Sequence, residues 1–277
     1  MKILLCTNGS TWANRALEIG GQIALQTASF VDVLAVARDA ERLAKVIETI
    51  TPLLDDFEAQ GISTTLHRRT GGLADQVIEQ AHAAPYDLVV IGSRGRRGIK
   101  RLFLGSVAVH VMEHAPTSVL VVKGRQRGLN RFLVCSAAGP TSQQAVRFTG
   151  RLAQALEASV TLVHVMSQIA LTDQAILADL EAPADDLIDR GSREGVHLHE
   201  MIDLLAAEGI KARAVVRHGL VLDELIAEAR EGQFDLLAIG AHITPGISSL
   251  LVGDLSQEIL LAVDRPVLIV RQLKPEP

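Results

Sequence analysis

Residues 87–106 read DLVVIGSRGRRGIKRLFLGS, and this stretch decides the fold. Residues 87–91 form a largely apolar strand pattern, and a glycine-rich loop then leads into a helix predicted to begin at residue 105. The loop contains three closely spaced glycines, Gly92, Gly95 and Gly98. Glycine permits positive φ and lets backbone N–H groups approach a ligand, and the helix start at Gly105 and Ser106 supplies further donors. A strand, a glycine-rich loop and a helix in this order predict a phosphate-binding site.

Basic side chains lie between these glycines. They are Arg94, Arg96, Arg97, Lys100 and Arg101, with no acid among them. Guanidinium groups pair well with phosphate oxygens, so the loop favours a polyanionic ligand such as a nucleoside triphosphate. Two better-known phosphate motifs do not match. A Walker A loop needs a lysine before Ser106, where Gly105 stands, and a dinucleotide fingerprint needs G-x-G-x-x-G after the first strand of its unit.

Composition restricts the class of protein. The chain has 277 residues, of which 48% are apolar and 21% charged, and this is enough for two globular domains. A net charge of −5 and an aromatic content of 3% argue against a nucleic-acid surface. No apolar run approaches the about 20 residues of a membrane span. Two cysteines, Cys6 and Cys135, do not make a disulfide framework. We therefore expect a cytoplasmic protein with no nucleic-acid and no membrane partner.

Apolar runs alternate with helical patterns along the chain, which is typical of doubly wound α/β domains. In the first half, strands are predicted at residues 2–6, 31–37, 62–67, 87–91 and 118–122. Helices are predicted at residues 11–27, 40–59, 72–83 and 105–114. The predicted fold therefore has two similar Rossmann-like domains, each with a five-stranded parallel sheet and helices on both faces.

The pattern of the first half recurs in the second. Cys135 follows Cys6 by 129 positions, whereas Gly240 follows Gly92 by 148. These offsets differ by 19 residues, which indicates an insertion within the acidic stretch 167–190, expected to be an exposed helix and loop. The predicted domains are residues 1–124 and 131–277, joined by a polar linker of residues 125–130.

The loop after the fourth strand resembles the ATP-binding motif of the universal stress protein family. The opening stretch ILLCTNGS at residues 3–10 and the stretch APTSVLVV at residues 115–122 also resemble that family. The likeness covers nearly the whole chain in two copies, as in a tandem member. It implies that one group of residues in the first copy surrounds the phosphates and ribose of ATP: Gly92, Arg94, Gly95, Gly105, Ser106 and Val107. It also implies that Val36 lies near the adenine, together with the loop Asn8, Gly9 and Ser10.

The resemblance further implies an intramolecular pseudo-dimer. The last strands of the two halves, residues 119–122 and 267–270, are apolar, and an exposed apolar strand edge favours pairing. We expect the two halves to pack through these strands. Formation of a homodimer by the whole chain is left open.

Metal binding is not predicted from the first copy. Family members that bind ATP usually have Asp where this chain has Asn8, and an amide lacks the charge that a cation or ribose contact would use. The presence of Mg²⁺ with the nucleotide is therefore left open. Ser10 has a second interpretation, since it can simply cap the following helix.

His110 and His114 have the i, i+4 spacing that allows two histidines to share a metal. The zinc-protease pattern needs Glu at position 111, where Val111 stands, so we expect these histidines to face solvent. His197 and His199 are assigned no role.

The second copy of the loop keeps Gly240 and Gly253 but loses the features that suit phosphate. Ile243 replaces the second glycine, Asp254 replaces the serine at the helix start, and the basic residues are absent. A branched side chain blocks backbone approach, and a carboxylate can occupy the helix N–H donors and repel an anion. We expect a degenerate site here and one nucleotide per chain.

These observations predict a non-enzymatic, nucleotide-dependent stress-response or regulatory module that binds ATP or another adenine nucleotide. No carboxylate stands in the first-strand loop or in residues 92–106 to hold a metal or activate water, so no catalytic residue is predicted. The alternative is an enzyme that slowly hydrolyses ATP or transfers a nucleotidyl group on the same fold.

Overall fold

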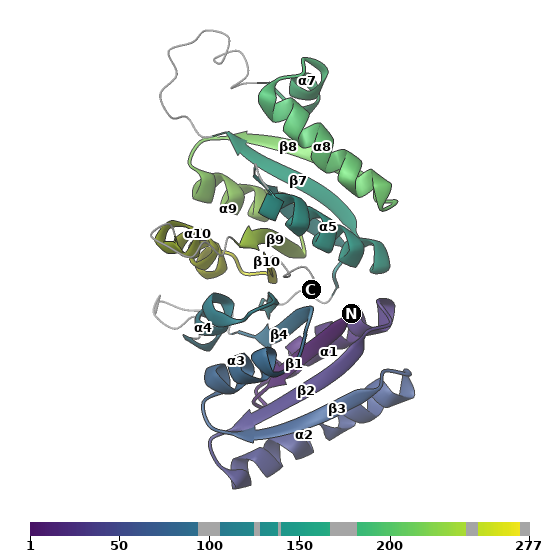
Figure 1. Ribbon diagram of the computed structural model, residues 1–277, viewed down its shortest axis with the longest axis vertical. Helices are drawn as coiled ribbons and strands as arrows, with labels where there is room; N and C mark the ends of the chain where they lie inside the picture. The colour runs from purple at the N-terminus through teal and green to yellow at the C-terminus, as the bar shows by residue number, and fades with distance from the viewer. Residues whose placement is uncertain (94–105, 125–127, 138–139, 167–181, 242–248, 272–277) are drawn as a thin grey trace. The chain divides into compact units, whose positions relative to one another are not determined.

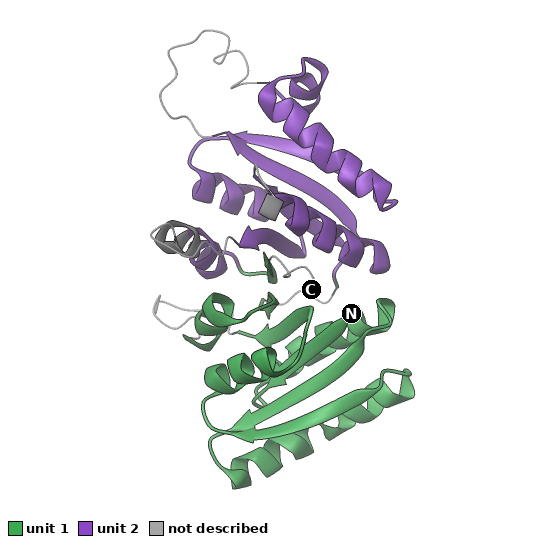
Figure 2. Ribbon diagram, in the orientation of Figure 1, with its two compact units in different colours: residues 1–128, 264–277 green, residues 129–263 purple. Residues whose placement is uncertain are grey.

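The computed structural model describes residues 1–93, 106–124, 128–137, 140–166, 182–241 and 249–271 (Figure 1). The chain divides into two compact units (Figure 2). The first contains residues 1–128 together with residues 264–277, and the second contains residues 129–263. We describe each unit by itself.

The first unit is built on a parallel sheet. Its strands are β1 (Lys2–Thr7), β2 (Phe30–Ala37), β3 (Thr64–Thr70), β4 (Leu88–Gly92) and β5 (Ser118–Val122). They lie in the order β3-β2-β1-β4-β5, and every neighbouring pair is parallel. The strand β10 (Val267–Arg271) pairs antiparallel with β5, with Leu268 opposite Leu120.

Helices cover both faces of this sheet (Figure 1). They are α1 (Thr11–Gln26), α2 (Ala40–Ala59), α3 (Leu73–Ala83) and α4 (Ser106–His114). Helix α1 contacts α2, and α3 contacts α4, so each face carries one pair. The central strands β1, β4 and β5 are buried along nearly their whole length, as expected for parallel strands covered on both sides.

The second unit repeats this plan. Its strands are β6 (Arg131–Ser136), β7 (Ser159–Met166), β8 (Ala212–His218) and β9 (Leu236–Ala241), parallel in the order β9-β6-β7-β8. Its helices are α5 (Pro140–Ala155), α7 (Ala184–Asp189), α8 (Arg193–Ala207), α9 (Val221–Glu231) and α10 (Ser249–Ala262). Helix α5 contacts α8, and α9 contacts α10. The predicted α/β class with Rossmann-like domains is confirmed.

The third strand lies later in the sequence than predicted. It was expected at residues 62–67, but β3 covers Thr64–Thr70. Its last residues, Arg68, Arg69 and Thr70, are polar, so the apolar pattern in the sequence ends before the strand does. They nevertheless pair with the end of β2, because β3 is an edge strand whose side chains can face solvent.

The described part of the acidic insertion contains α7. Its Ala184 and Leu187 are buried, and Leu187 joins a small apolar cluster with Met166 and Ala182. The acidic side chains Asp185 and Asp186 are exposed, as expected for a solvated helix. Residues 167–181 lie outside the described part of the chain.

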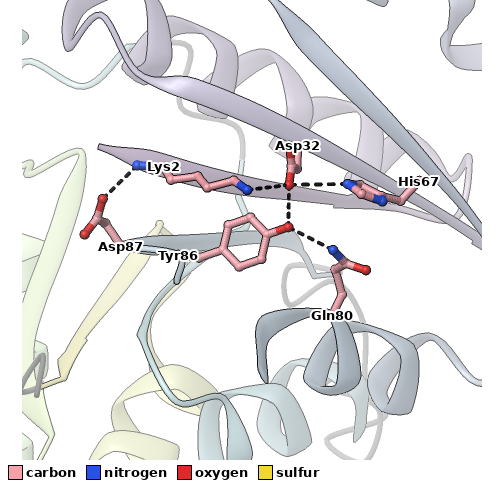
Figure 3. A network of polar contacts seen from close by, with 6 residues as sticks. All are labelled: Lys2, Asp32, His67, Gln80, Tyr86 and Asp87. Atoms are coloured by element: carbon pink, nitrogen blue, oxygen red, sulfur yellow. Dashed lines mark hydrogen bonds and ion pairs between the residues drawn. The ribbon is translucent and has the colours of Figure 1, made fainter. Parts of the chain in front are cut away.

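A polar network joins the amino ends of the strands in the first unit (Figure 3). The Tyr86 hydroxyl donates a 2.5 Å hydrogen bond to Asp32 Oδ2 and accepts one of 2.9 Å from Gln80 Nε2. Lys2 Nζ and His67 Nε2 lie 3.1 and 3.3 Å from the same Asp32 oxygen. Burial alone would raise the pKa of Asp32, but the contacts with Tyr86, Lys2 and His67 outweigh it, so this pKa lies below its usual value.

Part of this network recurs in the second unit, which supports the internal repeat. Asp87 accepts a hydrogen bond of 2.7 Å from the backbone N of Lys2, and Asp235 accepts one of 3.0 Å from that of Arg131. Lys2 Nζ lies 4.9 Å from the ring centre of Tyr86, and the Arg131 guanidinium lies 5.5 Å from that of Phe234. Phe234 has no hydroxyl, so only the first unit has the aromatic-to-carboxylate hydrogen bond.

Tyr86→Phe is expected to lower the free energy of unfolding by roughly 1–3 kcal/mol at pH 7, because it leaves a buried carboxylate with one donor fewer. A carboxylate whose pKa is depressed by folding stabilises the protein above its unfolded pKa of about 4, and this contribution is lost as pH falls through the folded pKa. The difference between variant and wild type should therefore shrink below pH 4 in urea unfolding curves. A difference that does not change with pH would contradict the ionised pair.

Candidate functional site

A pocket of about 460 Å³ opens at the carboxyl ends of β1, β2 and β3 in the first unit. Its described lining consists of Asn8, Val36, Ala37, Arg38, Gly71, Gly72, Leu73 and Val107. In the sheet order, β1 lies between β2 and β4. Strands β2 and β3 lie on one side of β1, and β4 and β5 lie on the other side, so the strand order reverses beside β1. Open α/β sheets bind their ligands at such switch points. Three predicted site residues, Asn8, Val36 and Val107, meet here.

The loop after β1 is shaped by its own side chains. Asn8 Oδ1 accepts a hydrogen bond of 3.1 Å from the backbone N of Ser10, and Gly9 has a φ of 74°. A Cβ on Gly9 would lie 3.1 Å from Val46 Cγ2, so both the positive φ and the nearby side chain favour glycine here. Ser10 Oγ accepts from the backbone N of Ala13 at 3.3 Å, which is the capping role given as its second interpretation. The loop therefore presents an exposed amide at the pocket rim.

The ends of β2 and β3 form the opposite wall. The backbone N of Gly71 donates to the carbonyl of Ala37 at 2.8 Å, which holds the two strand ends together. Helix α3 begins after Gly72, which provides no capping side chain. The first N–H groups of α3 can therefore donate to a ligand oxygen.

Arg38 supplies positive charge at this pocket. It is exposed, and it is the only Lys or Arg in the described lining. Within the described part of the chain, no acid lines the pocket. A pocket with one cation, free N–H donors and apolar walls suits an anionic ligand that also has an apolar portion.

Gly92 has a packing role that the sequence analysis did not anticipate. Its φ is not positive, in contrast to the expectation from the loop pattern. A Cβ at this position would lie 2.2 Å from the backbone O of Trp12 and 2.7 Å from Ala13 Cα. The close approach of α1 therefore explains why residue 92 is glycine.

The remaining motif residues are only partly described. Ser106 begins α4 and is exposed, and Val107 is half-buried against the pocket. Arg94, Gly95 and Gly105 lie outside the described residues.

The second unit has a smaller cavity, of about 230 Å³, at the carboxyl ends of β6, β7 and β9. No Lys or Arg occurs in the part of its lining that the structure describes. The lining is largely apolar, with Val163, Val165 and Leu225 among its members, and its polar groups include Ser136 and His164. The prediction of a degenerate site rests on Ile243 and on the side chain of Asp254, and both lie outside what is described.

A histidine cluster stands beside this second cavity. His197 Nε2 lies 2.7 Å from Ser136 Oγ, and His164 Nδ1 lies 3.1 Å from the Ser136 carbonyl. Burial and the neighbouring His164 lower the pKa of His197, so its ring is neutral near pH 7. Sequence spacing had assigned His197 no role, because its partners come from β6 and β7, far away in the chain.

Both cysteines are free. Burial raises the pKa of the Cys6 and Cys135 thiols, so neither is a thiolate near neutral pH. Of the helices that the structure describes, none has both the length and the apolar character needed to cross a membrane.

Sequence reasoning missed five pocket residues: Ala37, Arg38, Gly71, Gly72 and Leu73. A signal for some of them was present. A glycine pair, residues 71 and 72, stands at the start of the third predicted helix, and Arg38 directly follows the second predicted strand. Both places are carboxyl ends of parallel strands, where ligands bind in this class of fold.

Known proteins share this sequence and fold. The family model described as universal stress protein family matches residues 1–123 and 128–271. Universal stress protein YxiE of Bacillus subtilis is 25% identical over 146 residues, which are 51% of this chain and 99% of that protein. A universal stress protein of Mycolicibacterium smegmatis is 22% identical over 223 residues, or 77% of this chain and 71% of the relative.

A solved structure has the same fold over nearly the whole chain. The crystal structure of a universal stress protein from Archaeoglobus fulgidus covers 98% of both chains at 19% identity, with a TM-score of 0.73. The family model matches both halves of the chain, and the solved structure has the same fold over nearly its whole length. The chain therefore belongs to the universal stress protein family.

Proposed function

We propose that the first unit binds ATP or another adenine nucleotide and that the chain acts as a non-enzymatic, nucleotide-dependent module in the stress response. The observation that carries this proposal is the pocket that brings Asn8, Val36 and Val107 together at the strand switch point. The resemblance to the family implied these three residues before the pocket was described.

The chemistry of the pocket supports a nucleotide. Val36 and Leu73 offer apolar surface to a base, while Arg38 and the uncapped start of α3 offer positive charge and N–H donors to phosphates. The loop of residues 94–101, which follows β4 in sequence and precedes Val107, contains five basic residues that favour an anionic ligand. Sites for Mg²⁺ are not part of the proposal.

A non-enzymatic role is favoured because no acid lines the described part of the pocket. Hydrolysis or nucleotidyl transfer needs a group to orient water or to hold a metal at the phosphates. The side chain of Asn8 is polar and lines the pocket, but it is a neutral amide, and its oxygen already accepts a hydrogen bond from the backbone N of Ser10.

The proposal extends to the organisation and location of the protein. We also propose the pseudo-dimer of the two halves that the family resemblance implies. The free thiols of Cys6 and Cys135 suit the reducing conditions of the cytoplasm.

Titration of the full chain with ATP is expected to give saturable binding without turnover. Isothermal titration calorimetry measures the binding, and the rate of ADP production in the same preparation measures hydrolysis. Binding with ADP formation that continues through many turnovers would favour the enzymatic alternative. If none of the three nucleotides ATP, ADP and AMP produces a heat of binding in the calorimeter, nucleotide binding is rejected.

A further inference from the structure

Three side chains on α4 place metal-ligating atoms close together. His110, Glu113 and His114 occupy positions i, i+3 and i+4, which lie on one face of a helix. One ligand atom from each lies within 4.8 Å of those of the other two. Glu113 and His114 are exposed, so an ion can reach them from solvent.

A further carboxylate lies beside His110, on the neighbouring helix. Helices α3 and α4 pack against each other in the first unit (Figure 1). Asp75, in the first turn of α3, has its Oδ1 atom 4.0 Å from His110 Nε2. The three-residue cluster on α4 therefore has a second carboxylate, that of Asp75, next to one of its members.

The orientation of His114 is already that of a metal ligand. Its Nδ1 lies 2.9 Å from the carbonyl oxygen of His110. Because a carbonyl can only accept a hydrogen bond, Nδ1 carries the proton, and Nε2 keeps a free lone pair. Metal-bound histidines commonly donate their second N–H to a backbone carbonyl in this way, which fixes the tautomer and the ring orientation.

The end of α4 is also held in place. The Arg271 guanidinium donates to the carbonyls of Met112 and Glu113, the latter at 2.9 Å. The rings of His110 and His114 lie 4.3 Å apart between centroids. A fixed helix end limits the entropy lost when the side chains converge on an ion.

We propose that His110, Glu113, His114 and Asp75 form a binding site for a divalent transition metal ion, with Zn²⁺ as the fitting ion. Imidazole and carboxylate together suit Zn²⁺, which binds four such ligands at about 2.0–2.2 Å. The exposed side chains close the remaining separation by small rotations. The site differs from the nucleotide pocket, since His110 lies beyond Val107 on α4 and does not line that pocket.

Sequence spacing led to the opposite expectation for His110 and His114, namely that they simply face solvent. Position 111 excluded a protease motif, but Glu113 on the same face was not weighed. Asp75 is 35 residues away from His110 in the chain and becomes a partner only through the packing of α3 on α4.

The test uses the untagged full chain without nucleotide, because ATP itself chelates metal ions. Zn²⁺ binding is measured by calorimetry, and Co²⁺ is used as a spectroscopic probe whose visible absorption reports low coordination number. One ion per chain is expected. His110→Ala and His114→Ala should each weaken Zn²⁺ affinity by at least about tenfold, since even outer-shell partners contribute that much. Asp75→Asn should weaken it less than either.

His199→Ala is the matched control. His199 is an exposed helical histidine whose Nε2 lies 3.5 Å from Asp203 Oδ2. Within the described part of the chain, it belongs to no group of three possible metal ligands. This variant should leave Zn²⁺ affinity unchanged. Circular dichroism confirms that the variants fold. Wild-type affinity in the double variant His110→Ala, His114→Ala would overturn the proposal, as would the absence of Co²⁺ absorption in wild type.

Discussion

Val36→Trp is expected to weaken ATP binding by the chain about a hundredfold. Val36 is buried at 1% exposure and forms part of the pocket wall, so a Trp ring there occupies the space assigned to the base. Overpacking costs of about 3 kcal/mol correspond to a loss of affinity of about a hundredfold. Calorimetric titration with ATP measures the loss.

Val165→Trp provides the matched control, because Val165 follows Val36 by the repeat offset of 129 and lines the second cavity. This change should leave ATP affinity and a stoichiometry of one per chain unaltered. Equal losses in the two variants, or two equivalent sites in wild type, would contradict an asymmetric chain.

Arg38→Glu separates the loss of a site from the loss of folding. Arg38 is exposed, so reversal of its charge should leave the fold intact. ATP binding should weaken, whereas binding of adenosine, which has no phosphate, should change little. If Val36→Trp unfolds the protein, this second variant still tests the pocket.

Much of the fold could be predicted because the governing patterns are local. Parallel strands buried on both faces produce continuous apolar runs, and the runs at β1, β4 and β5 were found within one or two residues of their observed bounds. The error at β3 has the opposite cause. Arg68 and Arg69 are in a strand because of their pairing with β2, and no local pattern records that pairing.

The candidate site could be predicted only in part, for a similar reason. Val36 and Asn8 were implied by the family resemblance, which agrees with the rule that doubly wound domains bind ligands at the carboxyl ends of their strands. Arg38 and the pair Gly71 and Gly72 were missed because their importance depends on which strands are neighbours. The second unit gives the same lesson. The contact between His197 and Ser136 joins residues 61 positions apart.

Gly92 shows how a glycine in a loop pattern can have a structural reason other than the one that the pattern suggests. Three glycines near a phosphate loop suggested that each serves the ligand. At position 92 the structure provides a different cause, the backbone of α1 at Trp12 and Ala13. The two explanations make different predictions, because a ligand contact affects binding alone, whereas a packing contact affects folding.

Gly92→Ala is therefore expected to lower the free energy of unfolding by roughly 3 kcal/mol or more, since the added Cβ would meet backbone atoms that cannot rotate away. Gly61→Ala is the control: Gly61 has a φ of 83° but nothing within 4 Å of an added Cβ, so only the left-handed conformation is penalised, by about 1–2 kcal/mol. Urea unfolding at pH 7 measures both variants. Because the strain at position 92 lies between β4 and α1, it should appear without any nucleotide present. A Gly92→Ala chain as stable as wild type that has lost only its affinity for ATP would show that the glycine serves the ligand after all.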